Sequence, residues 1–210
     1  MSNPDGNDSK KFSWEQRYAD SDNLFGHTPS ELLLAWKDQL TAGQSALAVG
    51  DGEGRNGVWL AEQGLDVLSI DISATALSRA KAFATQRNVT LKTECADLLT
   101  WHWPQQGFDV ITSIFVHMSA EQRRQLHSSI LHAIKPGGLI LIEGYHTEQC
   151  KLGSGGPKDP SLMLTAELLE EDFPGMTILH SAVLPTEVIM DGKEYGKGVA
   201  CHFVAQSPVD

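Results

Sequence analysis

The sequence predicts an α/β protein with a doubly wound, mostly parallel seven-stranded sheet and an antiparallel hairpin at its C-terminal end. Three observations lead to this fold class. Short apolar runs, typical of buried strands, alternate with longer segments whose apolar residues recur at helical spacing. A loop rich in glycine follows the first apolar run, and two long β-like segments close the chain. Such alternation favours a parallel sheet with helices on both faces.

The first two strand–helix units are read directly from this alternation. The first strand is expected at Ser45–Val49 and a helix at Asn56–Gln63. Gly64 is suited to end that helix, because glycine adopts the left-handed conformation of a C′ residue at little cost. The second strand is expected at Leu65–Ile70. A helix over Ser73–Arg87 follows it and opens with a serine N-cap.

The middle of the chain continues the pattern. Strands are expected at Val89–Glu94 and Phe108–Phe115. A Ser-x-x-Gln capping box at Ser119 opens the next helix, and the Lys-Pro-Gly-Gly segment 135–138 is expected to end it. A fifth strand is expected at Leu139–Glu143, which completes five strand–helix units.

The chain then changes character. Residues 147–160 are rich in glycine, proline and lysine and are expected to form a loop. A short acidic helix is expected at Leu162–Asp172, capped by Ser161. Two strands, Thr177–Met190 and Lys197–Ala205, are expected to form a hairpin, because the segment between them begins with an Asp-Gly pair.

Length and composition limit the possibilities further. The 210 residues suffice for one domain, expected over residues 12–207 after a flexible polar segment, 1–11. No run of about eighteen apolar residues suggests a membrane span, and the polar start does not resemble a secretory signal. Three widely spaced cysteines favour reduced thiols, so a cytoplasmic location is expected.

Charge and motifs exclude several classes of partner. The net charge of −11 repels phosphate backbones, so no nucleic-acid partner is expected. No CxxC, HExxH or zinc-ligand spacing occurs, so no metal site is predicted. A small-molecule substrate fits better than a macromolecule. The sequence leaves a monomer and a homodimer equally open.

The glycine-rich loop Ala48–Gly57, AVGDGEGRNG, fits two nucleotide-binding motifs. GxGxxG, the dinucleotide fingerprint, fits poorly: counted from Gly50 it requires a small residue where Arg55 stands, and counted from Gly52 it leaves two extra residues after the strand. GxGxG from Gly50 needs neither adjustment. Asp71, about twenty residues on, suits the ribose hydroxyls of either ligand. Asp97 either reads an adenine amino group or is a solvated turn residue.

Together these motifs resemble class I methyltransferases that depend on S-adenosyl-L-methionine (SAM). The glycine loop, Asp71, ECADL, SIFVHM and KPGG occur in the order of that family, and the resemblance covers residues 12–205. GDGEGRN, SIFVH, LIEGYHTEQ…GSGGPKDP and WEQRYADSDNLFGHTPSELL look like the small bacterial enzymes similar to tellurite-resistance and thiopurine methyltransferases. The resemblance implies SAM as cofactor and methyl transfer to a small molecule, such as a thiol or chalcogen oxyanion. Ala48 replaces an acid that in the family helps to organise the methionine end.

The resemblance also implies the residues of the cofactor site. The glycine loop lines the methionine and ribose side, the end of the second strand binds ribose and adenine, and the segment after the third strand reads the adenine edge. Arg55 either pairs with the SAM carboxylate or forms a salt bridge with a neighbouring acid. The implied cofactor-binding residues are Gly50, Asp51, Gly52, Arg55, Asn56, Asp71, Ile72, Asp97, Leu98, Ile114 and Phe115.

The implied catalytic candidates are His117, Tyr145 and His146, on the rim beyond the fourth and fifth strands. A histidine there acts as a general base for a hydroxyl or amine acceptor, or as a hydrogen-bonding wall residue. The aromatic residues Trp14, Tyr18 and Phe25 belong to an N-terminal segment that either folds over the site or packs as core. His27 and Lys158 could offer positive charge to an anionic substrate. Two alternatives remain: a non-catalytic SAM-binding or sensor protein, and an NAD-dependent Rossmann oxidoreductase.

Overall fold

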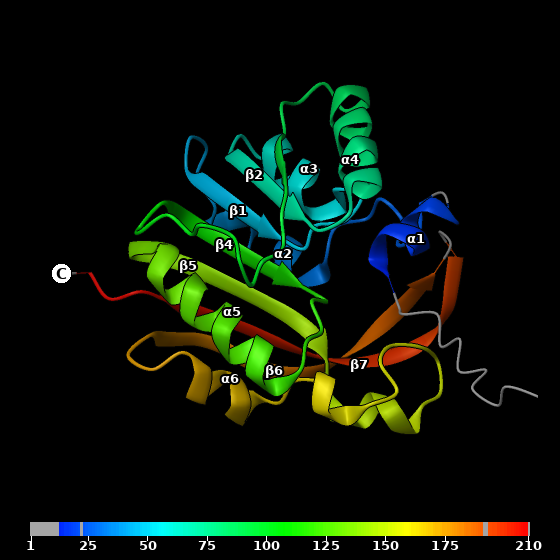
Figure 1. Ribbon diagram of the computed structural model, residues 1–210. Helices are drawn as coiled ribbons and strands as arrows, with labels where there is room; N and C mark the ends of the chain where they lie inside the picture. The colour runs from blue at the N-terminus through cyan, green and yellow to red at the C-terminus, as the bar shows by residue number, and fades with distance from the viewer. Residues whose placement is uncertain (1–12, 22, 191–192, 210) are drawn as a thin grey trace, which may run out of the picture.

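The computed structural model describes residues 13–21, 23–190 and 193–209. Seven strands form one sheet in the order β3-β2-β1-β4-β5-β7-β6 (Figure 1). Neighbours among β1–β5 run parallel, and β7 runs antiparallel to both β5 and β6. This confirms the predicted fold class. The strands are β1 Ser45–Val49, β2 Asp66–Asp71, β3 Lys92–Cys95, β4 Phe108–Ile114, β5 Ile134–Tyr145, β6 Thr177–Met190 and β7 Lys193–Gln206.

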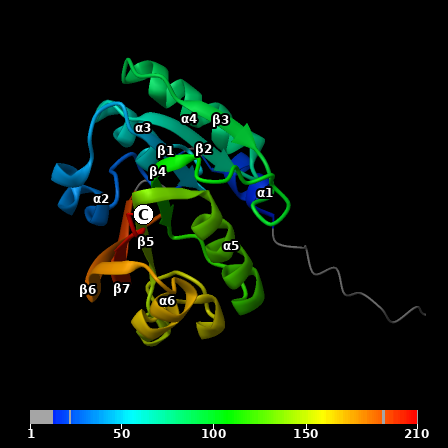
Figure 2. The same ribbon diagram turned by 90° about the vertical axis from the view of Figure 1, so that its left-hand side faces the viewer.

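Helices cover both faces of the sheet, with α2 and α3 on one side and α5 on the other (Figure 2). The α-helices are α1 Trp14–Ala19, α2 Glu31–Ala35, α3 Arg55–Glu62, α4 Ala74–Gln86, α5 Ala120–Ala133 and α6 Ala166–Asp172. Short 3-10 helices lie at Lys37–Gln39 (η1), Thr147–Lys151 (η2) and Pro160–Leu162 (η3). In the part of the chain that the structure describes, no helix is both long and apolar enough to cross a bilayer.

Two apolar cores result from the alternation of side chains along the central strands. Ile111 and Ile140 face α5 and α6, whereas Val110 and Leu141 face α2, α3 and α4, and all four are fully buried. A strand buried on both faces reads as a continuous apolar run rather than an alternating one. This explains why LILIE, an apolar run up to Glu143, was recognisable as a strand.

Two helix starts that the sequence predicted from a serine N-cap are present in the structure. The Ser73 hydroxyl accepts from the Ala76 N–H at the start of α4. Ser119 and Gln122 form the predicted capping box at the start of α5. Helix α3 begins after Gly54, whose φ of +86° places it in the left-handed region that favours glycine.

The segment at residues 135–138 follows the end of a helix as predicted, but the next strand begins earlier than expected. Helix α5 ends at Ala133, and β5 already begins at Ile134, so the Lys-Pro-Gly-Gly segment lies inside the strand. Phe108 pairs with Ile134, but Val110 pairs with Leu139, so β5 carries extra residues in an irregular stretch. Pairing with β4 therefore extends the strand past glycines that locally signal a turn. The predicted third strand is also shorter and later, at Lys92–Cys95.

The region between β5 and β6 is less regular than predicted. Thr165, not Ser161, caps α6, and Asp159 caps the separate 3-10 helix η3. Leu164 between them is buried, and its N–H donates to the Tyr145 carbonyl, which interrupts any continuous helix. The hairpin is present: Met190 pairs with Lys193, so β7 begins four residues before Lys197. The predicted Asp-Gly turn, residues 191–192, lies outside the described residues.

Candidate functional site

The candidate site lies where the strand order reverses, at the carboxyl ends of β1 and β4. In doubly wound sheets ligands bind at this point. Figure 1 shows α1 on one side of this end of the sheet and the segment containing η2 and η3 on the other. Gly50 and Gly52 follow β1 with φ of +60° and +58°. A Cβ at Gly50 would lie 2.7 Å from Val116 Cγ2, and one at Gly52 would lie 2.3 Å from the Tyr18 hydroxyl. Close packing and backbone conformation both require glycine here.

Asp71 lies at the end of β2 beside this loop. Its Oδ2 accepts from the Gly52 N–H at 2.9 Å, and its Oδ1 accepts from the Ser73 N–H at 2.9 Å. Burial raises the pKa of Asp71, and the two backbone hydrogen bonds oppose that shift. Each carboxylate oxygen has a further lone pair. Asp71 can therefore hold the loop and still accept from two ligand hydroxyls.

The carboxylates of the two acids within the loop, Asp51 and Glu53, both form hydrogen bonds with other residues of the chain. Asp51 is buried beneath the loop, where its carboxylate accepts from the Gly57 N–H at 3.0 Å and from the Ser69 hydroxyl at 2.8 Å. Burial raises its pKa to about 7. Ser69 pairs with Ala48 in the adjacent strand. The resemblance assigned Asp51 to the ligand side, but in the structure its carboxylate links the glycine loop to Ser69 of β2 and to Gly57 of α3.

Glu53 fixes the N-terminal segment to the glycine loop. Its carboxylate accepts from the N–H groups of Asn23 at 3.1 Å and Leu24 at 2.6 Å, and pairs with Arg79 at 2.9 Å. Arg79 also donates to the Tyr18 carbonyl at 2.7 Å. This segment therefore packs across the loop through specific polar contacts.

The aromatic residues of the same segment pack on one another. The rings of Trp14, Tyr18 and Phe25 lie with centroids 5.9 to 6.4 Å apart. Tyr18 is buried, so these rings form a small core, and the Tyr18 hydroxyl lies next to Gly52 of the loop. His27 instead stacks on Phe83, with ring centroids 4.1 Å apart.

The predicted adenine side is open. Ile72 is 55% exposed immediately after Asp71, and the Asp97 side chain is exposed as well. Leu98 is buried next to it. The Ala96 N–H donates to the Asp71 carbonyl at 3.0 Å, which joins the ends of β3 and β2. An exposed apolar side chain and an exposed carboxylate therefore follow the ends of β2 and β3, which this hydrogen bond joins.

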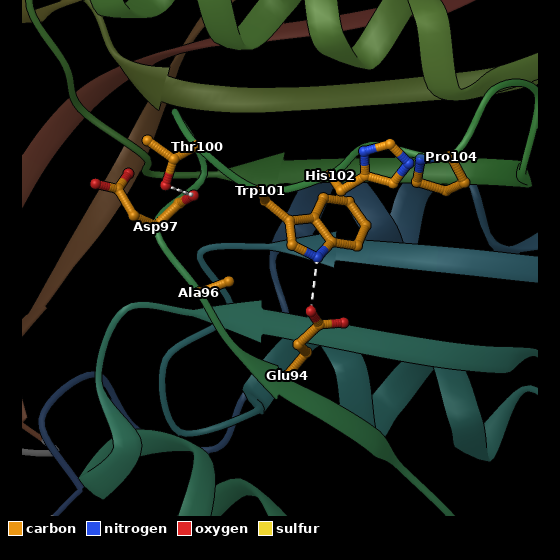
Figure 3. A pocket seen from close by; sticks show the side chains of 7 residues that line it. All are labelled: Glu94, Ala96, Asp97, Thr100, Trp101, His102 and Pro104. Atoms are coloured by element: carbon orange, nitrogen blue, oxygen red, sulfur yellow. Dashed lines mark hydrogen bonds between the residues drawn. The ribbon is translucent and has the colours of Figure 1, made fainter.

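A surface hollow of about 660 Å³ adjoins this side (Figure 3). Asp97 and Thr100 lie at one end, His102 and Pro104 at the other, and Trp101 lies between them. The Trp101 indole N–H donates to Glu94 at 2.8 Å. The hollow shares Asp97 with the candidate site, but its lining includes neither Asp71 nor the glycine loop.

His117 lies past β4 with one ring nitrogen free. Its Nδ1 is 3.2 Å from the Leu162 carbonyl, which can only accept, so Nδ1 carries the proton. Its Nε2 is buried and has no hydrogen-bond partner among the described residues. Burial lowers the pKa of His117 to about 4. The ring is therefore neutral near pH 7, and its unpartnered lone pair is on Nε2.

Tyr145 and Phe115 form the wall beside His117. The Tyr145 ring is parallel to His117 within 7°, with centroids 5.4 Å apart, and lies 4.7 Å from the Phe115 centroid. Phe115 has a φ of +56°, and its N–H donates to the Glu143 carbonyl at 2.7 Å. Ile114 is buried just before it. Burial raises the pKa of Tyr145 to about 12. The tyrosine is therefore a neutral hydroxyl, not a base.

Three further residues that the sequence singled out, His146, Lys158 and Asn56, have other surroundings. The His146 Nδ1 accepts from the Glu148 N–H at 3.3 Å, which caps η2. Lys158 is exposed. The Asn56 side-chain oxygen accepts from the Ser30 N–H at 2.9 Å and holds the start of α2. The structure brings together the glycine loop, Asp71, Phe115, His117 and Tyr145 at the same end of the sheet.

Sequence reasoning missed Glu143, which lies near the end of β5. It is 2% exposed, and the Ser30 hydroxyl donates to its carboxylate. His202 Nε2 lies 3.5 Å from its other oxygen. The signal was present, because LILIE places a charged residue inside an apolar strand that should be fully buried. Buried carboxylates require partners, so such a residue marks a polar cluster.

Comparison with known proteins decides between the nucleotide-binding motifs. Residues 46–138 match the family model described as a methyltransferase domain. This stretch of the chain is therefore similar to the domain of SAM-dependent methyltransferases. It is 33% identical over 126 residues to phosphoethanolamine N-methyltransferase 1 of Arabidopsis thaliana, a match that covers 60% of this chain and 24% of that protein. The chain thus spans about a quarter of the length of the first such relative.

Solved structures share the fold of this chain at low sequence identity. The structure described under "Conversion of a Disulfide Bond into a Thioacetal Group during Echinomycin Biosynthesis" has a TM-score of 0.76 at 20% identity, over 92% of this chain and 90% of that one. TehB from Haemophilus influenzae has a TM-score of 0.69 at 19% identity, over 84% and 61%. These likenesses support the Rossmann-like methyltransferase fold.

Proposed function

We propose that the chain is a SAM-dependent methyltransferase that methylates a hydroxyl or an amine of a small molecule. The observation that carries the proposal is the junction of the glycine loop with Asp71, within a domain that matches the methyltransferase family. An acid that accepts from the loop backbone and retains free lone pairs suits a ribose diol. The phosphoethanolamine relative supports a small-molecule acceptor.

The residues at the site fit the adenosyl part of SAM. Asp71 would bind the ribose hydroxyls, and the exposed Ile72 would cover one face of the adenine. The exposed Asp97 would accept from the adenine amino group. When bound, SAM supplies a methyl group that its sulfonium has already activated. The chain mainly has to orient the acceptor and exclude water.

The state of His117 supports a hydroxyl or amine acceptor. A thiolate or a chalcogen oxyanion needs no base, and its negative charge would be repelled by the lone pair on a neutral imidazole. A hydroxyl or amine donates a hydrogen bond to that lone pair and satisfies a buried nitrogen that otherwise has no partner. We therefore place the acceptor hydrogen at His117 Nε2. The narrower resemblance to tellurite-resistance and thiopurine methyltransferases would instead require a soft acceptor.

The first test is binding of SAM, S-adenosylhomocysteine and NAD by isothermal titration calorimetry. We expect micromolar binding of the two adenosyl ligands and at least tenfold weaker binding to the Asp71→Ala variant. Asp66→Ala, at the exposed start of β2, is the matched control. Binding of NAD alone would revive the oxidoreductase alternative. SAM binding without turnover of any hydroxyl, amine or thiol acceptor would favour a sensor protein.

A further inference from the structure

Gln149 is a fully buried glutamine in η2 whose side-chain amide bonds to three different residues. Its Nε2 donates to the Ser154 hydroxyl and to the Gly155 carbonyl, both at 3.1 Å. Its Oε1 accepts from the Val199 N–H of β7 at 2.9 Å. Because a buried amide is costly to leave without partners, these three bonds fix the side chain in one orientation. Gln149 therefore ties the loop at 154–155 to β7.

The side chain of Gln149 also completes the hydrogen bonding of β7 where β5 ends. Pairing of β5 with β7 stops at Tyr145 and Ala200. The His146 N–H still donates to the Val199 carbonyl at 2.9 Å, but the His146 carbonyl accepts from the Gln149 N–H instead of from β7. The Gln149 Oε1 takes the place of that carbonyl on the Val199 N–H. A side chain thus continues the ladder and docks the following residues onto the strand.

Further contacts extend this attachment along the segment 147–164, which contains η2 and η3 and lies beside β7 in Figure 1. The Ser154 hydroxyl donates to the Lys197 carbonyl of β7. The Cys150 Sγ, next to Gln149, lies 3.6 Å from the Sδ of Met163, which is buried. The attachment at η2 therefore reaches the far end of the segment.

That far end of the segment contacts the ring of His117. The Leu162 carbonyl accepts from His117 Nδ1 at 3.2 Å, and the Leu164 N–H donates to the Tyr145 carbonyl at 2.9 Å. A Cβ at Gly156 would lie 2.8 Å from the Tyr145 ring, and that ring lies parallel to His117. Without a carbonyl at Nδ1 a neutral imidazole can carry its proton on either nitrogen. Only the form protonated at Nδ1 offers a lone pair at Nε2.

We infer that Gln149 is a positioning residue for methyl transfer: by holding the segment 147–164 on β7, it keeps the Leu162 carbonyl at His117 Nδ1 and the lone pair on Nε2. The inference rests on the proposed function, in which Nε2 takes the acceptor hydrogen. Gln149 acts through the segment and not on the acceptor. Loss of its three bonds releases the segment from β7 and allows both tautomers of His117.

The tautomer of His117 is measured directly by ¹⁵N NMR of the full chain at pH 7. Two-bond nitrogen–proton correlations distinguish a proton on Nδ1 from one on Nε2, and His117→Asn identifies the signals. The wild type should carry the proton on Nδ1 alone. Gln149→Leu is close in size, removes all three bonds and should show a mixture of both tautomers. Gln105→Leu, at an exposed glutamine, is the matched control and should give the wild-type spectrum for His117.

The same variants are compared in a methyl-transfer assay with a hydroxyl or amine acceptor. Gln149→Leu should lower kcat about 10- to 100-fold, because a base that is displaced or in the wrong tautomer no longer meets the acceptor hydrogen. Its affinity for S-adenosylhomocysteine should stay within threefold of the wild-type value, which also shows that the variant is folded. Ser154→Ala removes only the bonds of one hydroxyl and should change both readouts in the same direction by less.

Several results would overturn the inference while the proposed function stands. These are a wild-type His117 with its proton on Nε2, a single tautomer in Gln149→Leu, and mixed tautomers with an unchanged kcat. A loss of affinity for S-adenosylhomocysteine as large as the loss of kcat would also overturn it, because the effect would then not be specific to His117. If Gln149→Leu does not fold, Ser154→Ala decides by the same criteria. If the wild type binds no S-adenosylhomocysteine, the proposed function fails, and the inference about methyl transfer fails with it.

Discussion

Asp51 should make the stability of the folded chain fall as the pH rises. Its carboxyl group is buried in the glycine loop and accepts from the Gly57 N–H and the Ser69 hydroxyl. Desolvation penalises the ionised form, so its pKa is about 7 instead of the ordinary 3.8. Asp71 adds to this shift, whereas the Arg55 charge opposes it. The substitution Asp51→Asn removes the titration and retains an oxygen for the Gly57 N–H.

The sign and size follow from proton linkage. Between pH 3.8 and about 7 the folded chain binds a proton at Asp51 that the unfolded chain has already released. The contribution of Asp51 to the free energy of unfolding is therefore largest at low pH and declines as the pH rises towards 7. The full difference between the two pKa values corresponds to at most about 4 kcal/mol. For a chain of this length that is a shift in Tm of roughly 10 °C.

Thermal unfolding at pH 5, 6, 7 and 8 measures this effect. The Tm of Asp51→Asn should rise relative to that of the wild type between pH 5 and pH 7, and the difference should level off between pH 7 and pH 8. Because all other titrating groups are shared, the difference between the two curves isolates Asp51. Asp66→Asn, an exposed acid paired with Lys92, should run parallel to the wild type. A constant difference between wild type and Asp51→Asn over the whole range would refute the reasoning.

Two further outcomes are expected. His117→Asn should lower kcat about 10²- to 10⁴-fold with a hydroxyl or amine acceptor, which is the usual contribution of general acid–base catalysis. The affinity for S-adenosylhomocysteine should stay within threefold of the wild-type value. Full activity of the variant in a methyl-transfer assay would contradict the role of Nε2. Asp172 accepts from Arg123 at 2.6 Å and His127 at 2.8 Å between α6 and α5. Asp172→Ala leaves the buried Arg123 uncompensated and should cost about 3–5 kcal/mol in thermal unfolding, whereas the exposed Glu171→Ala should change stability little.

Features encoded by neighbouring residues were predictable. The strands β1, β2 and β4 were found because each is mostly buried and carries several apolar residues within a short segment. The caps at Ser73 and Ser119 were found because a cap and its backbone partner are only three residues apart. Helix α5 ends before segment 135–138 as predicted, but β5 begins earlier than expected, because Ile134 pairs with Phe108 of β4 ahead of the irregular stretch.

The features of the candidate site are also of two kinds, those set by neighbouring residues and those set by contacts between distant segments. The sequence by itself determined the strand–helix alternation, the glycine loop and the acid at Asp71, because each depends on a short pattern of residues. Only the tertiary structure decided that Asp51 braces the loop from below and that Ser30 meets Glu143 across 113 positions of the chain. The orientation of a buried polar side chain depends on which donors the fold brings within reach, and those donors come from distant segments.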